Sequence, residues 1–326
     1  MPIAIPNKPH VFTLYTLSPD VRAYAEQFFR LTSPEDEGFD EWREKAEGIM
    51  VRSVEVTEED VAGMVRCRFV GKHGVGVDKL AVKALKAKGV VVMNTAGVNA
   101  TCVAELALTL IMSVARNVPY IDRTIRSGVT LTKAEAGAVG FQLTGKTLGL
   151  VGGGNIGFAL GKMWSGAFGG AVLVFDPYLS AGAEEAWCSA VPKFRRVTDL
   201  NDLLPEIDVL SVHVPLLDST KGLIGRDQLR RMKKSAVVIN TARGGVIDED
   251  ALAQALDEGV ITGAGLDAWS EEPPSLDKFS RLINHPRVVS TPHVGAASLD
   301  VIDQTARAVV DHLAEAFAGK EPRDVV

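Results

Sequence analysis

The chain contains few cysteines and no dense run of charge of one sign. Its 326 residues include three cysteines, Cys67, Cys102 and Cys188, without CxxC spacing. This excludes a disulfide framework or a cysteine-based zinc site and is typical of a reducing compartment. An HExxH pattern is also missing, so we expect no metal site. The 35 basic and 41 acidic residues are spread along the chain and leave a net charge of −6, which disfavours binding to nucleic acids.

Long hydrophobic runs are missing as well. The most apolar run, residues 103–115, contains Glu105, ends before Arg116 and is shorter than the ~20 residues that span a bilayer. The first ten residues carry prolines and no apolar core of signal-peptide length. We therefore expect a cytoplasmic protein without a membrane partner, in which residues 103–116 form a buried helix.

The composition of the chain is typical of compact globular domains. Hydrophobic residues make up 46% and charged residues 23% of the chain, and its length favours two domains at about 150 residues each. Short β-rich runs alternate with amphipathic segments, so we expect an α/β fold with two doubly wound parallel sheets. The expected strands are 11–15, 48–52, 68–71, 90–94, 147–151, 171–176, 209–214, 236–240, 262–267 and 288–291. The expected helices are 18–29, 57–64, 80–88, 103–116, 156–168 and 298–318.

A glycine-rich turn opens the second series of strands. Gly152, Gly154 and Gly157 form GxGxxG directly after an expected strand and directly before an expected helix, which is the context that dinucleotide binding requires. These glycines permit a tight turn, close approach of the backbone to a pyrophosphate, and close packing of helix and sheet. Asp176 stands nineteen residues after Gly157, where a carboxylate accepts hydrogen bonds from ribose hydroxyls and repels a 2′-phosphate. The pattern predicts NAD as cofactor, with NADP disfavoured.

Three polar residues, Arg243, Glu272 and His293, follow expected strands of the second half. Ligands of open α/β sheets bind at these carboxyl ends. Reduction of a carbonyl to an alcohol needs a hydride donor, a proton donor and a positive charge at the oxygen-rich end of the substrate. A dinucleotide, His293 and Arg243 would supply these, and Glu272 would orient the imidazole and favour its charged form. Taken singly, each residue is more typical of a turn, a helix cap or a solvated surface.

With these motifs, the chain resembles the NAD-dependent D-isomer-specific 2-hydroxyacid dehydrogenase family from about residue 48 to residue 318. The resemblance rests on GVGVD at 74–78, NTAGVN at 94–99, VAE at 103–105, LTGKTLGLVGGGNIG at 143–157, FDPY at 175–178, HVPL at 213–216, NTARGG at 240–245 and TPHVG at 291–295. It implies a flavodoxin-like substrate domain formed by residues 1–100 and 297–326, and a Rossmann NAD-binding domain at 101–296. It also implies a homodimer through the NAD-binding domain and a small 2-oxo or 2-hydroxy acid as substrate.

The resemblance further implies a role for each residue of the candidate site. Arg243 binds the 2-oxo acid, and His293 paired with Glu272 is the acid and base. Asp267 contacts the nicotinamide carboxamide, and Val75 and Gly76 offer backbone amides to the substrate carboxylate. The full set of implied cofactor residues is Gly152, Gly154, Asn155, Ile156, Gly157, Asp176, Pro177, His213, Val214, Pro215, Thr220, Thr241, Ala242, Arg243, Asp267, His293 and Gly295. The full set of implied substrate residues is Arg52, Lys72, Gly74, Val75, Gly76, Arg243 and His293.

Three positions depart from residues that are common in such families. Asn155 stands where phosphoglycerate dehydrogenase-like members carry a basic residue, so a pyrophosphate would rely more on backbone amides. Lys72 stands where arginine is frequent, and lysine recognises a planar carboxylate or phosphate less tightly. One hypothesis is that Arg52 and Lys72 select a substrate with a second anionic group; the alternative is that both are solvated. Trp269 would either narrow the substrate pocket or pack internally.

Other activities are open within the same resemblance. A phosphite-oxidising relative would keep Arg243, Glu272 and His293, whereas a formate dehydrogenase has glutamine at the position of Glu272 and is disfavoured. An NAD(H)-sensing corepressor also keeps the triad but carries an aromatic residue closely after the histidine, where this chain has VGAA at 294–297. We therefore expect an enzyme that interconverts a 2-oxo acid and its D-2-hydroxy acid, with the identity of the acid left open.

Overall fold

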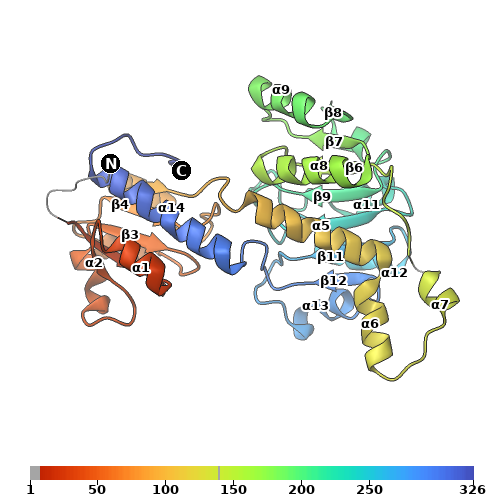
Figure 1. Cartoon of the computed structure of the whole chain (residues 1–326), viewed down its shortest axis with the longest axis horizontal. Coiled ribbons are helices and arrows are strands. Elements are labelled where there is room, and N and C mark those ends of the chain that lie inside the picture. Colours follow the sequence, from red (N-terminus) through yellow and green to blue (C-terminus); the bar gives the residue numbers. More distant parts are fainter. Residues whose placement is uncertain (1–7, 139) are drawn as a thin grey trace. The chain divides into compact units, whose positions relative to one another are not determined.

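The structure, a computed structural model, describes residues 8–138 and 140–326 (Figure 1). The chain divides into two compact units: unit 1 comprises Met1–Asn99 and Ala296–Val326, and unit 2 comprises Ala100–Gly295. Each unit contains one parallel sheet, with helices in the connections between its strands. Parallel neighbouring strands require such crossovers, because the chain must return to the end of the sheet where the previous strand began. The predicted fold class, α/β with two doubly wound parallel sheets, is confirmed.

The sheet of unit 1 has five strands in the order β2-β1-β3-β4-β5, which is the flavodoxin-like order. The strands are β1 (His10–Thr13), β2 (Arg30–Thr32), β3 (Gly48–Val51), β4 (Phe69–Lys72) and β5 (Val91–Met93). Four of them lie within two residues of the expected ranges. β2 has no counterpart among the expected strands, because an edge strand of three residues carries too short a hydrophobic pattern to be recognised.

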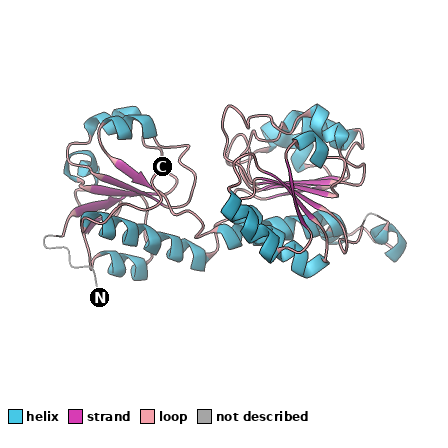
Figure 2. Cartoon of the chain, turned by 90° about the horizontal axis from the view of Figure 1, so that it is seen from above, coloured by secondary structure: helices cyan, strands magenta, loops and turns pink. Residues whose placement is uncertain are grey.

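Helices cover both faces of this sheet (Figure 2). They are α1 (Pro19–Ala25), the 3-10 turn η1 (Phe39–Glu41), α2 (Trp42–Lys45), α3 (Glu58–Gly63), α4 (Val82–Ala87) and α14 (Leu299–Phe317). Successive strand residues point to opposite faces. Val11 and Met50 therefore pack with α1 and α14, whereas Phe12 and Ile49 pack with α2, α3 and α4.

Two contacts tie the C-terminal segment into unit 1. A Cβ at Gly71 of β4 would lie only 2.5 Å from Val309 Cγ1, so the missing side chain lets α14 approach the sheet. Beyond α14, Val325 forms an antiparallel bridge with Met93 of β5. The N–H of Val326 donates to the carbonyl of Val92 at 3.0 Å. The last residues therefore pair with the edge strand β5, whose polar backbone groups would otherwise face solvent.

The sheet of unit 2 has seven strands in the order β12-β11-β10-β9-β6-β7-β8, the Rossmann order with one further strand. The strands are β6 (Leu148–Val151), β7 (Val172–Phe175), β8 (Phe194–Val197), β9 (Val209–Val212), β10 (Val237–Asn240), β11 (Gly263–Leu266) and β12 (Val288–Ser290). Only β8 was not expected. It lies at the edge of the sheet and carries Arg195 and Arg196, which weaken its hydrophobic pattern.

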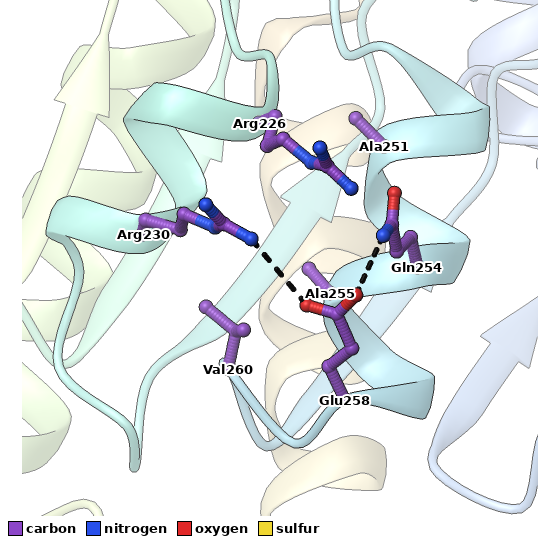
Figure 3. Close-up of a pocket in the computed structure, with 7 residues that line it drawn as sticks. All are labelled: Arg226, Arg230, Ala251, Gln254, Ala255, Glu258 and Val260. Atoms are coloured by element: carbon purple, nitrogen blue, oxygen red, sulfur yellow. Dashed lines mark hydrogen bonds and ion pairs between the residues drawn. The ribbon is translucent and has the colours of Figure 1, made fainter.

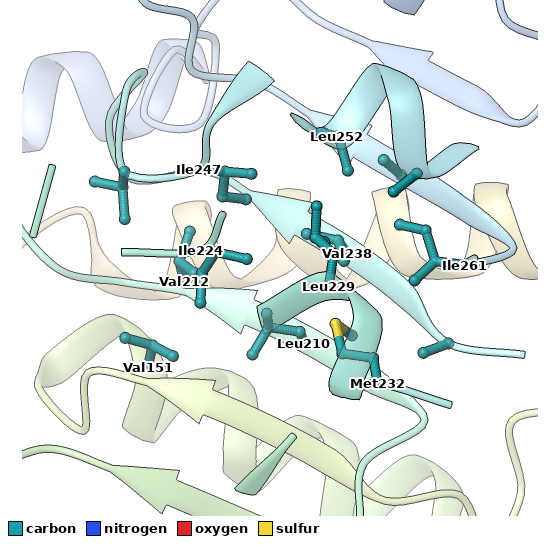
Figure 4. Close-up of a cluster of buried hydrophobic side chains, with 14 of the residues drawn as sticks. Val151, Leu210, Val212, Ile224, Leu229, Met232, Val238, Ile247, Leu252 and Ile261 are labelled. Carbon is teal, nitrogen blue, oxygen red and sulfur yellow. The ribbon is translucent and has the colours of Figure 1, made fainter. Parts of the chain in front are cut away.

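The helices of unit 2 divide between the two faces of its sheet. They are α5 (Ala100–Arg116), α6 (Val118–Arg126), α7 (Lys133–Gly137), α8 (Asn155–Phe168), α9 (Ala181–Ala190), α10 (Leu200–Leu203), α11 (Arg226–Arg231), α12 (Glu249–Asp257) and α13 (Leu276–Ile283). Leu148 and Leu150 pack with α5, α8 and α9. Val151 and Leu210 point to the opposite face and pack with α10 to α13, in the cluster shown in Figure 4.

Helix α5 forms where the sequence predicted a buried helix and buries one face in unit 2, whereas the helices that follow it are not buried. Leu110, Ile111 and Val114 are at most 1% exposed in the core of unit 2. In contrast, α6 and α7 contain no buried residue. Among the described residues, no single helix is long and apolar enough to cross a bilayer; α5 and α6 pass that test only together, with a 63° bend between them.

Candidate active site

The glycine-rich turn between β6 and α8 is closely packed on one side and open on the other. Gly152 has a φ of 100°, and a Cβ there would lie 2.6 Å from the carbonyl oxygen of His213. A Cβ at Gly157 would lie 2.3 Å from the carbonyl oxygen of Gly152. A Cβ at Gly154 would meet nothing within 4 Å. The turn therefore needs glycine at its inner positions, and it leaves open space beside the first N–H groups of α8, where Asn155 and Ile156 lie.

Asp176, which follows β7, holds this turn in place. Its Oδ2 accepts from the N–H of Gly153 at 2.9 Å, and its Oδ1 accepts from the N–H of Tyr178 at 2.9 Å across Pro177. Arg196 of β8 donates to the carbonyl of Asp176 at 3.1 Å. A carboxylate oxygen accepts more than one hydrogen bond, so these contacts leave Asp176 able to bind a ribose hydroxyl.

Two polar side-chain atoms at the ends of β9 and β10 are enclosed without a hydrogen-bond partner among the described residues. His213 Nδ1 and Thr241 Oγ1 are enclosed and have no hydrogen-bond partner within residues 8–138 and 140–326. Nε2 of His213 lies 2.9 Å from Ser211 Oγ, and burial lowers the pKa of His213 to about 4, so its ring is neutral at pH 7. Enclosed polar atoms without partners are rare in folded proteins. Together with the glycine-rich turn, they fit a bound dinucleotide.

The loop after β9 contains further predicted cofactor residues. Val214 and Pro215 directly follow His213. The hydroxyl of Thr220 donates to the carbonyl of Pro215 at 2.6 Å and accepts from the N–H of Leu217 at 2.8 Å. These bonds close the loop on itself at the carboxyl edge of the sheet.

Arg243 lies in a tight loop after β10. The side chain of Asn240 accepts from the N–H of Ala242 at 3.0 Å and donates to the carbonyl of Arg243 at 2.8 Å. The guanidinium donates to the carbonyl of Ala242 at 2.7 Å. A Cβ at Gly244 would lie 1.8 Å from the carbonyl carbon of Trp269, so this loop contacts the backbone that leads to Glu272.

His293 and Glu272 form a pair, as the sequence suggested. Nδ1 of His293 lies 2.7 Å from Oε1 of Glu272, and each side chain is 35% exposed. Burial alone would raise the pKa of Glu272. The hydrogen bond from His293, its charge and that of Arg243 outweigh this and place the pKa below its ordinary value. Glu272 is therefore a carboxylate at neutral pH, and Nε2 of His293 is the ring nitrogen left for a substrate.

Asp267 anchors the segment that carries His293, a role that the sequence did not indicate. Its side chain is fully buried and accepts from Thr291 Oγ1 at 2.6 Å, from the N–H of Val294 at 2.8 Å and from the N–H of Gly295 at 2.9 Å. His293 has a φ of 60°, which costs free energy in a non-glycine residue. The three bonds to Asp267 on either side of His293 hold this conformation.

Two other residues shape this region: Trp269, for which the sequence left two roles open, and Gly244, which sequence reasoning did not single out. Trp269 is 3% exposed, lies 5.0 Å from the ring of Phe279 and donates from Nε1 to the carbonyl of Thr291 at 3.0 Å, so it packs internally. Because Gly244 has no side chain, the Arg243 loop can contact the backbone of Trp269. The glycine pair in NTARGG indicates that another backbone segment approaches this loop closely. The pair does not indicate which segment, because Trp269 is distant in sequence.

The predicted substrate residues Arg52, Lys72, Gly74, Val75 and Gly76 all lie in unit 1, where β3 and β4 end. Lys72 is 8% exposed, and its ammonium donates to the carbonyls of Arg52 and His73, each at 2.7 Å. Gly74 has a φ of 94°, and Val75 is 43% exposed. In the loop 73–76 Val75 is therefore exposed, whereas His73 is buried beside the Lys72 ammonium.

Unit 2 also has a surface pocket between α11 and α12 (Figure 3). It is lined by Arg226, Arg230, Ala251, Gln254, Ala255, Glu258 and Val260. Helix α12 begins after the carboxyl end of β10 and runs back to the amino end of β11. Its last turn therefore lies at the amino ends of the strands, whereas Arg243 follows a carboxyl end. The pocket is therefore not part of the candidate active site.

Comparison with known proteins identifies the family of this chain. Residues 108–295 match the D-isomer specific 2-hydroxyacid dehydrogenase, NAD binding domain. The chain is 36% identical over 282 residues to D-3-phosphoglycerate dehydrogenase of Methanocaldococcus jannaschii, covering 86% of this chain and 52% of that protein, so it spans about half of that relative's length. It is 35% identical over 323 residues to glyoxylate/hydroxypyruvate reductase B of Pectobacterium carotovorum, covering 98% of each chain.

A solved structure extends the likeness to the whole fold. The NADPH-dependent glyoxylate/hydroxypyruvate reductase of Sinorhizobium meliloti, in complex with NADP and malonate, superposes with a TM-score of 0.81 at 27% identity and covers 98% of this chain and 97% of its own. The likeness thus includes both units and an NAD(P)-binding fold. The chain belongs to the D-isomer-specific 2-hydroxyacid dehydrogenase family.

Proposed function

We propose that the protein catalyses the reversible, NAD-dependent reduction of a small 2-oxo acid to its D-2-hydroxy acid. The observation that carries this proposal is the 2.7 Å pair of His293 and Glu272 at the carboxyl edge of the unit 2 sheet. The sheet also carries the glycine-rich turn at the same edge, where ligands of such sheets bind. The nicotinamide, when bound, supplies or accepts the hydride.

In this proposal His293 transfers the proton of the substrate hydroxyl. Glu272 holds Nδ1, so Nε2 is the nitrogen that donates a proton to the carbonyl oxygen during reduction and accepts it during oxidation. The lowered pKa of Glu272 keeps this carboxylate ionised, so it accepts a hydrogen bond from Nδ1 and orients the imidazole. General acid catalysis of this kind contributes about 10²–10⁴-fold to the rate.

Arg243 is proposed to bind the carboxylate and carbonyl oxygens of the 2-oxo acid. Its charge contributes to the lowered pKa of Glu272, which is consistent with a guanidinium close to the dyad. A guanidinium matches the planar geometry of a carboxylate with two parallel hydrogen bonds. The amides of Val75 and Gly76 are proposed as a second carboxylate-binding element on unit 1.

We propose NAD in preference to NADP because of Asp176. Its carboxylate is fixed by the N–H groups of Gly153 and Tyr178 at the end of β7. A fixed negative charge at this position accepts hydrogen bonds from ribose hydroxyls and repels a 2′-phosphate. The preference is tested by comparing kcat/KM for NADH and NADPH; equal values would contradict it.

A homodimer through unit 2 is proposed from the exposed apolar side chains of its α5–α6 region. Met112, Val118, Ile125 and Val129 are 47%, 55%, 59% and 53% exposed. Figure 1 shows α6 and α7 extending from the body of unit 2. Exposed apolar residues concentrated in one stretch of the chain are consistent with a protein contact. Sedimentation of Ile125→Glu should show a monomer, whereas Val65→Glu, at a 72% exposed position of unit 1, should sediment like the unchanged protein.

The reaction is tested by following NADH absorbance with glyoxylate, hydroxypyruvate, pyruvate, phenylpyruvate, oxaloacetate and phosphohydroxypyruvate. The His293→Ala variant is the control. Oxidation of NADH by the unchanged protein and its loss in the variant would support the proposal and rank the substrates. A folded protein that binds NADH and oxidises it with none of these acids would contradict it, and NAD reduction with phosphite would then identify the alternative reaction.

A further inference from the structure

We propose that Lys72 is a positioning residue for the substrate-carboxylate loop of unit 1, rather than a cation that binds a second anionic group of the substrate. This inference rests on the proposed function, in which the amides of Val75 and Gly76 bind the carboxylate. The inference explains how these amides are oriented: the Lys72 ammonium donates to the carbonyls of Arg52 and His73, a contact that the sequence does not reveal.

The loop 73–76 is held through its carbonyl groups. The ammonium of Lys72 donates to the carbonyl of His73 at 2.7 Å. The N–H of Thr95 donates to the carbonyl of Gly74 at 3.3 Å, and Asn94 Nδ2 donates to the carbonyl of Val75 at 3.1 Å. Three consecutive carbonyls are thus bonded to the body of unit 1.

Bonding of the carbonyls determines where the amides point. In a trans peptide the C=O and the following N–H point in opposite directions. Because the carbonyls of Gly74 and Val75 face Thr95 and Asn94, the N–H groups of Val75 and Gly76 face away from them. Within the described part of the chain these two N–H groups make no hydrogen bond. They are therefore free to bind an anion.

Lys72 holds the first carbonyl of the loop 73–76 and joins this loop to the segment that follows β3. Its ammonium also donates to the carbonyl of Arg52, at 2.7 Å, so one group ties the end of β3 to the end of β4. A Cβ at Gly74 would lie 4.0 Å from Nζ, which places the charge directly beside the loop. The residue is only 8% exposed, so its side chain is largely buried and Nζ donates to backbone carbonyls of the protein.

A positioning role and a direct contact predict different kinetics. If Lys72 orders the amides, its loss weakens binding of every substrate carboxylate by the same factor. If Lys72 binds a second anionic group, its loss weakens only dianionic substrates. A uniform loss of binding raises KM and leaves kcat nearly unchanged.

The test uses Lys72→Met, which retains the length of the side chain and removes its charge and donors. Lys88→Met is the matched control, since Lys88 also donates to two backbone carbonyls, those of Val61 at 2.7 Å and Ala62 at 2.9 Å, away from the loop. We expect Lys72→Met to raise KM about 10- to 100-fold, equally for glyoxylate and for the dianion oxaloacetate, with kcat and the NADH Kd within twofold. Lys88→Met should leave all three constants unchanged.

Hydrogen exchange of the substrate-free protein provides a readout that does not depend on activity. The amides of Gly74, bonded to Thr95 Oγ1 at 2.8 Å, and of Thr95 should exchange at least about tenfold faster in Lys72→Met than in the unchanged protein or in Lys88→Met. If Lys72→Met does not fold, Lys72→Arg, which is bulkier at this buried position, should raise both KM values by one common factor.

Two results would overturn the inference. One is an increase in KM for oxaloacetate that is at least tenfold larger than for glyoxylate, which would identify Lys72 as a direct anion ligand. The other is unchanged exchange at Gly74 and Thr95. If the unchanged protein reduces no 2-oxo acid, the proposed function fails by itself, and the exchange rates still decide whether Lys72 orders the loop.

Discussion

Replacing Gly244 by alanine should disable the site without removing any of its functional groups. A Cβ at this position would lie 1.8 Å from the carbonyl carbon of Trp269 and 2.1 Å from the nitrogen of Ser270. Both are backbone atoms that cannot rotate away, and ordinary carbon contacts begin near 3.5 Å. One of the two loops must therefore move by more than about 1 Å.

The displaced loops carry Arg243 on one side and lead to Glu272 on the other. The N–H of Trp269 donates to Glu272 Oε1 at 3.3 Å, so a shift of this backbone also shifts the partner of His293. A misplacement of about 1 Å costs about 10²-fold in rate, which corresponds to about 3 kcal/mol of transition-state stabilisation. Overpacking should also lower the free energy of unfolding by about 1–3 kcal/mol.

The assay is steady-state reduction of the best 2-oxo acid with NADH, together with NADH binding followed by fluorescence. We expect kcat/KM to fall about 10²-fold and the NADH Kd to change little. Gly166→Ala is the control, because nothing lies within 4 Å of a Cβ there and the position is inside α8. It should retain full activity and gain up to about 1 kcal/mol in stability. A folded Gly244→Ala variant with unchanged kcat/KM would refute the packing argument.

Three further perturbations follow from the geometry. His293→Ala should lower kcat about 10²–10⁴-fold at an unchanged NADH Kd, and stopped-flow turnover within twofold of the unchanged protein would contradict the acid–base role. Asp176→Ala should raise KM for NADH and increase the kcat/KM ratio of NADPH over NADH; an unaltered ratio would count against the charge argument. The free energy of unfolding should fall as the pH is lowered from about 6.5 to 4, because the folded pKa values of His73 and His213 are about 3 and about 4. In that window the unfolded state binds protons that the folded state excludes, so each histidine contributes a slope of about 1.4 kcal/mol per pH unit. Denaturant titrations at several pH values measure this slope, and a flat profile would be inconsistent with buried neutral rings.

Local pattern was sufficient for the fold class and for a hypothesis about the chemistry of the candidate residues. Strand–helix alternation indicated two parallel sheets because the periods of 2 and 3.6 residues are properties of short segments. GxGxxG and the carboxylate of Asp176 are likewise read within about 25 residues of sequence. The strands that were not predicted, β2 and β8, are edge strands, which have one partner and a correspondingly weak pattern.

Pairings between distant segments were decided only by the tertiary structure. The contact of His293 with Glu272 spans 21 residues, and the bonds of Asp267 to the His293 segment span up to 28. Spacing could place these residues at strand ends but could not bring them within hydrogen-bond distance. The same holds for Lys72. For a lysine at the end of a strand the sequence left a substrate cation and a solvated side chain open, and only the fold places the carbonyls of Arg52 and His73 around its ammonium. The sequence by itself therefore determined the fold class and most of the strands and indicated candidate reactive groups, whereas the partners of these groups depend on packing between segments that no local pattern encodes.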